Sequence, residues 1–158
     1  MTFSDQYIVA LATATFLRGI GAGMITGVLL IVPSRRRIGL AAYAVFTRAQ
    51  YQAFGVKVYA ASTIAGSLLT LVLLAVTFQL HDSVAQRWSL VASGTATIFA
   101  FGGTSRAFPT MMRLWSDESE DCLTLTHLLD TFVWWGWFSA AWHLVAFGAL
   151  LCALVAGW

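Results

Sequence analysis

The sequence predicts an all-α integral membrane protein: one domain, residues 1–158, folded as a four-helix bundle with short loops. Only 10% of the residues are charged and 59% are hydrophobic, whereas a soluble globular chain is about 25% charged. The mean hydropathy is +0.77, and apolar stretches of about 20 residues, long enough to cross a bilayer as helices, recur along the chain. This composition excludes soluble enzymes and secreted disulfide scaffolds, and the net charge of +2 indicates no nucleic-acid partner.

Four apolar stretches define the predicted spans, at about residues 8–32, 58–80, 88–108 and 131–158. The first contains one charge, Arg18, and ends at Pro33, while the second contains none. The third is diluted by Ser, Thr and Gly and contains Arg106 near its end, and the fourth contains His143 but no formal charge. No basic segment precedes the first span, so we expect an uncleaved signal anchor there instead of a signal peptide.

The connection between the first two spans is too apolar to be a simple loop. Residues 38–54 are Ala-rich, contain no Pro and carry Tyr and Phe at intervals of three to five residues. This pattern predicts an interfacial helix or an early cytoplasmic extension of the second span. By contrast, acidic Ser116–Asp121 is predicted to be a solvated loop.

The basic residues predict the orientation in the membrane. One side carries most of them: Arg35, Arg36, Arg37, Arg48, Lys57, Arg106 and Arg113, against Arg87 alone on the other side. Because Lys and Arg collect in cytoplasmic loops, we expect both termini on the non-cytoplasmic side.

Gly19, Gly23 and Gly27 recur every fourth residue on one face of the first span. Residues without a Cβ let membrane helices approach closely, so these three are predicted to pack against another helix. A homo-oligomer contact and the close approach of a planar ligand are the alternatives.

Arg18 and His143 are predicted to share one depth in the membrane. Arg18 lies about ten residues into the first span, roughly 15 Å deep, where an Arg costs on the order of 2.5–3.5 kcal/mol unless it finds polar partners. His143 is near the middle of the antiparallel fourth span. The same level contains four hydroxyls that complete a predicted polar layer: Ser67, Thr70, Thr95 and Thr97. The alternatives are an Arg18 that reaches the interface and a His143 that is only a hydrogen-bonded packing residue.

Two further groups are candidates for chemistry at the fourth span. His127 and Asp130, three residues apart, share a helix face, and a carboxylate beside an imidazole suits proton transfer. In the alternative interpretation, a basic neighbour holds Asp130 at the membrane interface. Trp134 and Trp142 fit either an interfacial aromatic belt or the stacking of a flat ligand. The two Cys residues form no metal-binding motif, so no metal site is predicted.

Three stretches resemble the anthrone-oxygenase-like family of small four-helix membrane proteins. They are the glycine-rich span GIGAGMITGVLLIVP (Gly19–Pro33), the tyrosine-containing segment YAVFTRAQYQAFGVKVY, and the proline-marked end of the third span, FPTMMRLW. The chain departs from the family pattern at Met111-Met112, where the family tends to have Asn, and at Trp142-His143, where it tends to have Arg. The resemblance implies oxidation of anthrones to anthraquinones by molecular oxygen, without a cofactor.

If the chain is such an enzyme, a base removes a proton from an activated CH₂ group before oxygen reacts. His143 or the His127–Asp130 pair is then the base, and Arg18 stabilises the enolate-like anion. The substrate-binding candidates are Trp134, Trp142, Thr70 and Thr95. This hypothesis predicts a closed pocket lined by Arg18, His143 and tryptophans.

The alternative function is a non-catalytic accessory subunit that packs by its glycine face against a larger membrane protein. That hypothesis predicts that Arg18 or the glycine face is buried against a different chain. A small transporter or channel is a third class, for which the predicted polar layer is the only support. The expected partners are thus the lipid bilayer, a hydrophobic small molecule or a larger membrane protein, and another copy of the chain.

Overall fold

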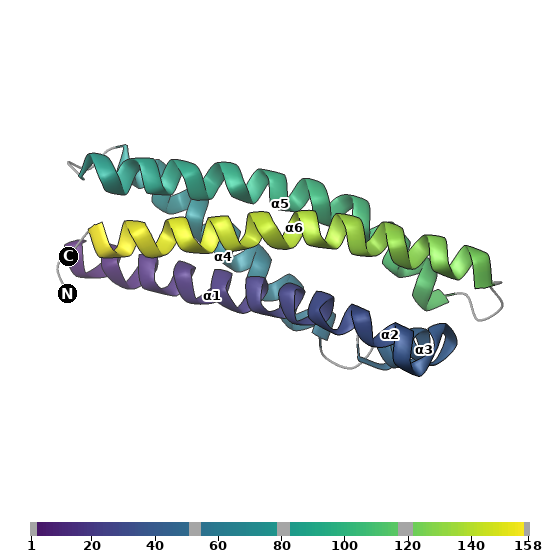
Figure 1. The fold of residues 1–158 in the computed structure, drawn as a ribbon. Coiled ribbons are helices and arrows are strands. Elements are labelled where there is room, and N and C mark those ends of the chain that lie inside the picture. The colour runs from purple at the N-terminus through teal and green to yellow at the C-terminus, as the bar shows by residue number, and fades with distance from the viewer. Residues whose placement is uncertain (1–2, 51–54, 79–82, 117–121, 157–158) are drawn as a thin grey trace.

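The computed structural model describes residues 3–50, 55–78, 83–116 and 122–156, and these residues form an all-α structure (Figure 1). Four long helices dominate it: α1 (Phe3–Ile31), α4 (Val56–Thr77), α5 (Val84–Ser116) and α6 (Cys122–Ala156). Between α1 and α4 lie a 3-10 turn (Val32–Ser34) and the short helices α2 (Arg35–Ile38) and α3 (Leu40–Gln50). Pro33 stands in the turn directly after α1, where the first span was predicted to end.

The four long helices lie side by side, and each runs antiparallel to the one before it (Figure 1). Both termini are at one end of the bundle, and α2 and α3 are at the other. Helix α5 packs against α6 most extensively, and α1 packs against both α4 and α6. The contact between α4 and α5 is the least extensive of the four.

Three helical segments among the described residues are long and apolar enough to cross a membrane: Asp5–Ile38, Val56–Thr77 and Leu123–Ala156. They coincide with the first, second and fourth predicted spans. Helix α5 contains the predicted third span, residues 88–108, but is not among these segments. The Ser, Thr, Gly and Arg residues that dilute its sequence account for the difference.

Two helices extend beyond the predicted spans. Helix α5 continues past Pro109 to Ser116, and α6 begins at Cys122, before residue 131. The extended ends bury apolar side chains in one core cluster, which includes Leu114 of α5 and Leu129 of α6. This burial offsets the backbone hydrogen bond that a proline removes from a helix. Of the predicted acidic loop, residues 117–121 lie outside the described residues.

Helix α3 confirms that the connection between the first two spans is helical. It follows Gly39, whose φ of 86° reverses the chain after α2. Tyr43 and Thr47 are buried, and burial raises the pKa of the Tyr43 phenol above its ordinary value. Over residues 40–49 of α3, the exposed residues are all apolar: Ala41, Ala42, Val45, Phe46 and Ala49.

A close contact of α5 with α6 at Gly103 provides a test of the packing. A Cβ at Gly103 would lie 2.9 Å from Phe138 Cδ1 and 3.0 Å from the Ser139 backbone nitrogen, whereas one at neighbouring Gly102 would meet nothing within 4 Å. We expect Gly103→Ala to lower the free energy of unfolding by about 1–3 kcal/mol. The matched variant Gly102→Ala should be neutral or slightly stabilising. Thermal unfolding in detergent compares the two, and equal melting temperatures would contradict the packing.

Candidate functional site

Arg18 faces the interior of the bundle. Its side chain is 1% exposed, and its two terminal nitrogens donate hydrogen bonds to Ser67 Oγ of α4 at 2.9 Å and to Thr97 Oγ1 of α5 at 2.6 Å. Gly66 makes room for it, since a Cβ there would lie 3.0 Å from Arg18 Cδ. Arg18 thus joins three helices, and it is buried within its own chain instead of reaching the interface.

No carboxylate among the described residues neutralises Arg18. Asp130 pairs with Arg35 at 2.8 Å, and Asp5 lies thirteen residues before Arg18 on α1, about 20 Å along the helix axis. The Nε atom of Arg18 has no hydrogen-bond partner among the described residues. The guanidinium therefore places a positive charge, bound only by hydroxyls, inside the bundle.

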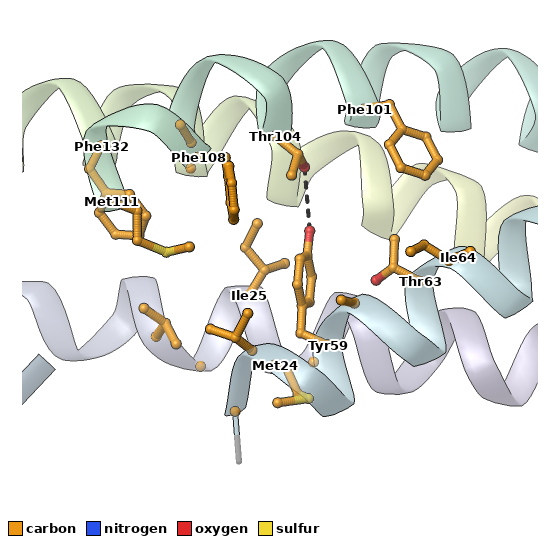
Figure 2. Close-up of a pocket in the computed structure, with 18 of the residues that line it drawn as sticks. Met24, Ile25, Tyr59, Thr63, Ile64, Phe101, Thr104, Phe108, Met111 and Phe132 are labelled. Carbon is orange, nitrogen blue, oxygen red and sulfur yellow. Dashed lines mark hydrogen bonds between the residues drawn. The ribbon is translucent and has the colours of Figure 1, made fainter. Parts of the chain in front are cut away.

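His143 is also buried, with 1% of its surface exposed. Its Nε2 lies 3.0 Å from the Tyr59 hydroxyl of α4, and that hydroxyl lies 3.4 Å from Thr104 Oγ1 of α5 (Figure 2). Thr104 in turn lies 2.8 Å from the Ser139 hydroxyl of α6. Arg18 is close enough to Tyr59 and His143 to interact with both electrostatically. Of the predicted polar layer, Ser67 and Thr97 thus bind Arg18, and His143 belongs to an adjoining group of hydroxyls.

Tyr59 is the central residue that the sequence analysis missed. It stands two residues after Lys57 at the start of a span, where a tyrosine is ordinarily an interfacial anchor. The available signal was helical spacing, because Tyr59, Thr63 and Ser67 fall on one face of α4.

A cavity of about 440 Å³ lies between the helices next to this polar layer. Its wall is mostly apolar and includes Phe101, Phe108 and Phe132, and the polar side chains in it are Tyr59, Thr63 and Thr104 (Figure 2). Small-molecule sites in proteins are typically about 300–1,000 Å³, apolar, with few polar groups. The cavity therefore has the size and composition of a site for a hydrophobic small molecule.

The glycine face of α1 serves two purposes within this chain. A Cβ at Gly19 would lie 3.0 Å from Phe147 of α6, as expected of a packing glycine. A Cβ at Gly23 or Gly27 would meet nothing within 4 Å, and both residues line the cavity. The prediction of packing against another helix is thus corrected, within this chain, for Gly23 and Gly27, which border open space.

The predicted substrate-binding residues lie outside the cavity wall. Thr70 is buried and donates a hydrogen bond to the Gly66 carbonyl at 2.7 Å, and Thr95 is exposed. Trp134 is 72% exposed, and Trp142 stacks on Phe99 with ring centroids 4.7 Å apart. Thr95 and Trp134 therefore lie at the surface, while Thr70 and Trp142 are engaged in contacts with neighbouring residues.

The prediction that Arg18, His143 and tryptophans line the pocket was wrong for this cavity. None of these residues is in the wall of the cavity. Instead, His143 connects with the cavity through Tyr59, and phenylalanines and methionines supply the large apolar surfaces.

His127 and Asp130 lie apart from the cavity. His127 is exposed, and the Asp130 carboxylate accepts a hydrogen bond from Arg35 instead. The structure thus has the alternative arrangement, in which a basic neighbour holds Asp130. The described residues contain no group of three or more side chains suited to hold a metal ion.

The described structure is thus a helical bundle with a buried polar layer beside an apolar cavity. No family model, curated protein or solved structure matches this chain. The geometry of the cavity and its polar neighbours is therefore the basis of the functional proposal.

Proposed function

We propose that the protein is a four-span membrane enzyme that oxidises a flat aromatic molecule of the anthrone type with molecular oxygen. One observation carries the proposal: the Tyr59 hydroxyl belongs to the wall of an apolar cavity and lies 3.0 Å from the buried imidazole of His143. This arrangement supplies a proton acceptor to an otherwise apolar site, which is what base-assisted oxidation of a CH₂ group requires.

The arrangement of the helices supports four spans. Helix α5 runs beside α6 for most of its length and connects the far end of α4 with the start of α6 (Figure 1). If α4 and α6 cross a bilayer, α5 crosses with them. The exposed Arg36, Arg37 and Arg113 belong to the end that carries α2 and α3, so the positive-inside rule puts that end in the cytoplasm and both termini opposite. The apolar exposed face of α3 suits the membrane interface.

The cavity favours a ligand that is flat and hydrophobic. Gly23 and Gly27 add no side chain to the wall and leave space beside α1, while Phe108 and Phe132 present aromatic rings. Aromatic rings bind other rings in stacked or edge-to-face arrangements. The hydroxyls of Tyr59 and Thr104 offer hydrogen bonds to a single polar group. A fused-ring ketone combines these features.

In the proposed reaction, Tyr59 Oη takes a proton from the substrate CH₂ group as its own proton passes to His143 Nε2. This transfer requires the His143 tautomer that carries its proton on Nδ1. The carbanion is an enolate, because its charge extends to the ring ketone, and the positive charge of Arg18 stabilises it. Four electrons then pass from the CH₂ carbon to O₂. One oxygen atom becomes the new carbonyl, and the other leaves as water with the two hydrogen atoms.

A specific observation also favours the accessory-subunit alternative. Gly23 is exposed, and a side chain there would meet nothing in the chain, so a helix of another protein fits against this part of α1. In that case the partner helix covers the cavity that the enzyme hypothesis assigns to a substrate.

Filling the cavity tests the proposal. We expect Gly23→Leu to lower anthrone turnover by about tenfold or more, because the new side chain occupies the space of the substrate. The matched variant is Gly102→Leu, which also adds a side chain at an exposed glycine with open space around it but lies outside the cavity wall. It should retain normal turnover.

Formation of anthraquinone and consumption of O₂ are measured on the purified protein in lipid nanodiscs. Absence of turnover in the unmodified protein would contradict the oxygenase, and equal turnover in the two variants would contradict the assignment of the cavity.

A further inference from the structure

We propose that the ligand enters the cavity sideways from the bilayer, through an opening between α4 and α5. The inference rests on the proposed function only in assuming that the cavity holds a small hydrophobic molecule. Three large side chains line the cavity and are also about half exposed: Ile64 of α4 at 52%, and Phe101 and Phe108 of α5 at 41% and 46%. Side chains that belong to both the wall and the outer surface mark the mouth of the cavity.

The other helix pairs around the cavity are joined by close glycine contacts. In each, an added Cβ would lie 3.0 Å or less from a side chain of the neighbouring helix: Gly136 against Leu29, Gly103 against Ser139, and Gly21 against Thr63. These contacts join α6 to α1, α5 to α6, and α1 to α4, respectively. On α1, the exposed Gly23 also lies in the cavity wall, but it carries no large side chain. A molecule as thick as an aromatic ring does not pass through such contacts.

Helices α4 and α5 make their own close contact away from the mouth. A Cβ at Gly94 would lie 3.2 Å from Leu74 Cδ2, and Leu74 is ten residues beyond Ile64 along α4. At the cavity, the hydrogen bond between Tyr59 and Thr104 joins the two helices, and at 3.4 Å it is long. The two helices are therefore packed at one end and only weakly joined at the level of the cavity.

The mouth opens at a depth occupied by lipid chains. Ile64 lies eight residues after the start of α4, about 12 Å along a helix that crosses a hydrocarbon core roughly 30 Å thick. A molecule that enters here must already be dissolved in the bilayer and must be uncharged on the way. The ligand class is accordingly a flat, lipid-soluble, neutral aromatic compound, whose reactive group meets Tyr59 at the inner end of the opening.

The test narrows the mouth without filling the rest of the cavity. The variant Ile64→Trp adds a large side chain at the mouth, and Leu68→Trp adds the same side chain one turn further along α4. Leu68 is 60% exposed and does not line the cavity. Binding is measured by energy transfer from the protein's tryptophans to a fluorescent probe. Because each variant gains one tryptophan, this signal can be compared directly between the two variants. The probe is anthracene, which is flat, fluorescent and without a reactive CH₂ group, delivered from liposomes by stopped-flow mixing with the protein in nanodiscs.

We expect Ile64→Trp to slow both association and dissociation by about tenfold, with the dissociation constant changed much less, because a barrier on the path affects both rates. Leu68→Trp should bind and release anthracene as the unmodified protein does. Equal rates in the two variants, with normal binding in the unmodified protein, would overturn the lateral opening but leave the cavity assignment intact. Failure of the unmodified protein to bind anthracene would overturn the cavity assignment itself.

Discussion

Replacing Tyr59 with Phe is expected to lower anthrone turnover by about 10²–10⁴-fold, the usual contribution of a positioned acid–base group. The substitution keeps the ring in the cavity wall and removes only the hydroxyl that contacts His143. Substrate binding should therefore change little, so the loss appears in kcat and not in KM. Steady-state kinetics on the protein in nanodiscs measures both constants.

The control for this variant is Tyr7→Phe. The Tyr7 hydroxyl lies 2.6 Å from Thr77 Oγ1 at the opposite end of α4 from Tyr59, so its removal also breaks a tyrosine–threonine hydrogen bond, but away from the cavity. Turnover should remain normal. The single variant His143→Ala should lose activity, as Tyr59→Phe does. The single variant His127→Ala should keep normal activity, because His127 is exposed. Normal turnover in both His143→Ala and Tyr59→Phe would contradict the proposed base.

Replacing Arg18 with Met is expected to separate activity from stability. Turnover should fall by about 10²–10³-fold, because the charge that stabilises the enolate is lost. The free energy of unfolding should stay the same or rise, since exchanging a buried charge for an apolar side chain of similar size is often neutral or stabilising, by up to about 4 kcal/mol for buried ion pairs.

The hydrogen bonds around Arg18 explain why the fold should tolerate its loss. The Ser67 hydroxyl donates to the Thr63 carbonyl at 2.6 Å, and the Thr97 hydroxyl donates to the Ser93 carbonyl at 2.7 Å. Both hydroxyls therefore keep a partner when the guanidinium is gone. Turnover and thermal unfolding are measured on the same preparation, with Arg18→Lys as the variant that retains the charge. A large fall in melting temperature for Arg18→Met would show that Arg18 is structural, and normal turnover would remove it from the mechanism.

Three of the long helices were predictable from sequence, because apolar stretches can be counted along the chain. The apolar stretches located α1, α4 and α6, and the count from each helix end put Arg18 and His143, which are both buried in the structure, at one predicted depth. Which side chains face inward depends on helix rotation, which depth does not determine. Thr95 and Thr97 illustrate this difference: they lie at nearly the same depth, but two residues turn a helix by about 200°, so Thr97 binds Arg18 while Thr95 is exposed.

Features that depend on neighbouring helices were not predictable from a single sequence. Gly19 and Gly23 have the same spacing signal, yet only Gly19 meets a side chain, because Phe147 of α6 happens to lie opposite it. Pro109 is a local stop signal that the packing of α5 on α6 overrides. The cavity depends on where α4 and α5 separate, and no residue pattern within either helix records that separation.

The modest apolarity of α5 bears on how the protein is made. Its inner face is completed by α6: Ser93 donates a hydrogen bond to the Ala146 carbonyl, and Ala100 accepts one from Ser139. If α5 crosses the bilayer as proposed, it leaves the ribosome before α6 exists, and at that moment its polar groups lack these partners and lipid offers none. Under the proposed four-span topology, α5 and α6 therefore have to be integrated as a pair.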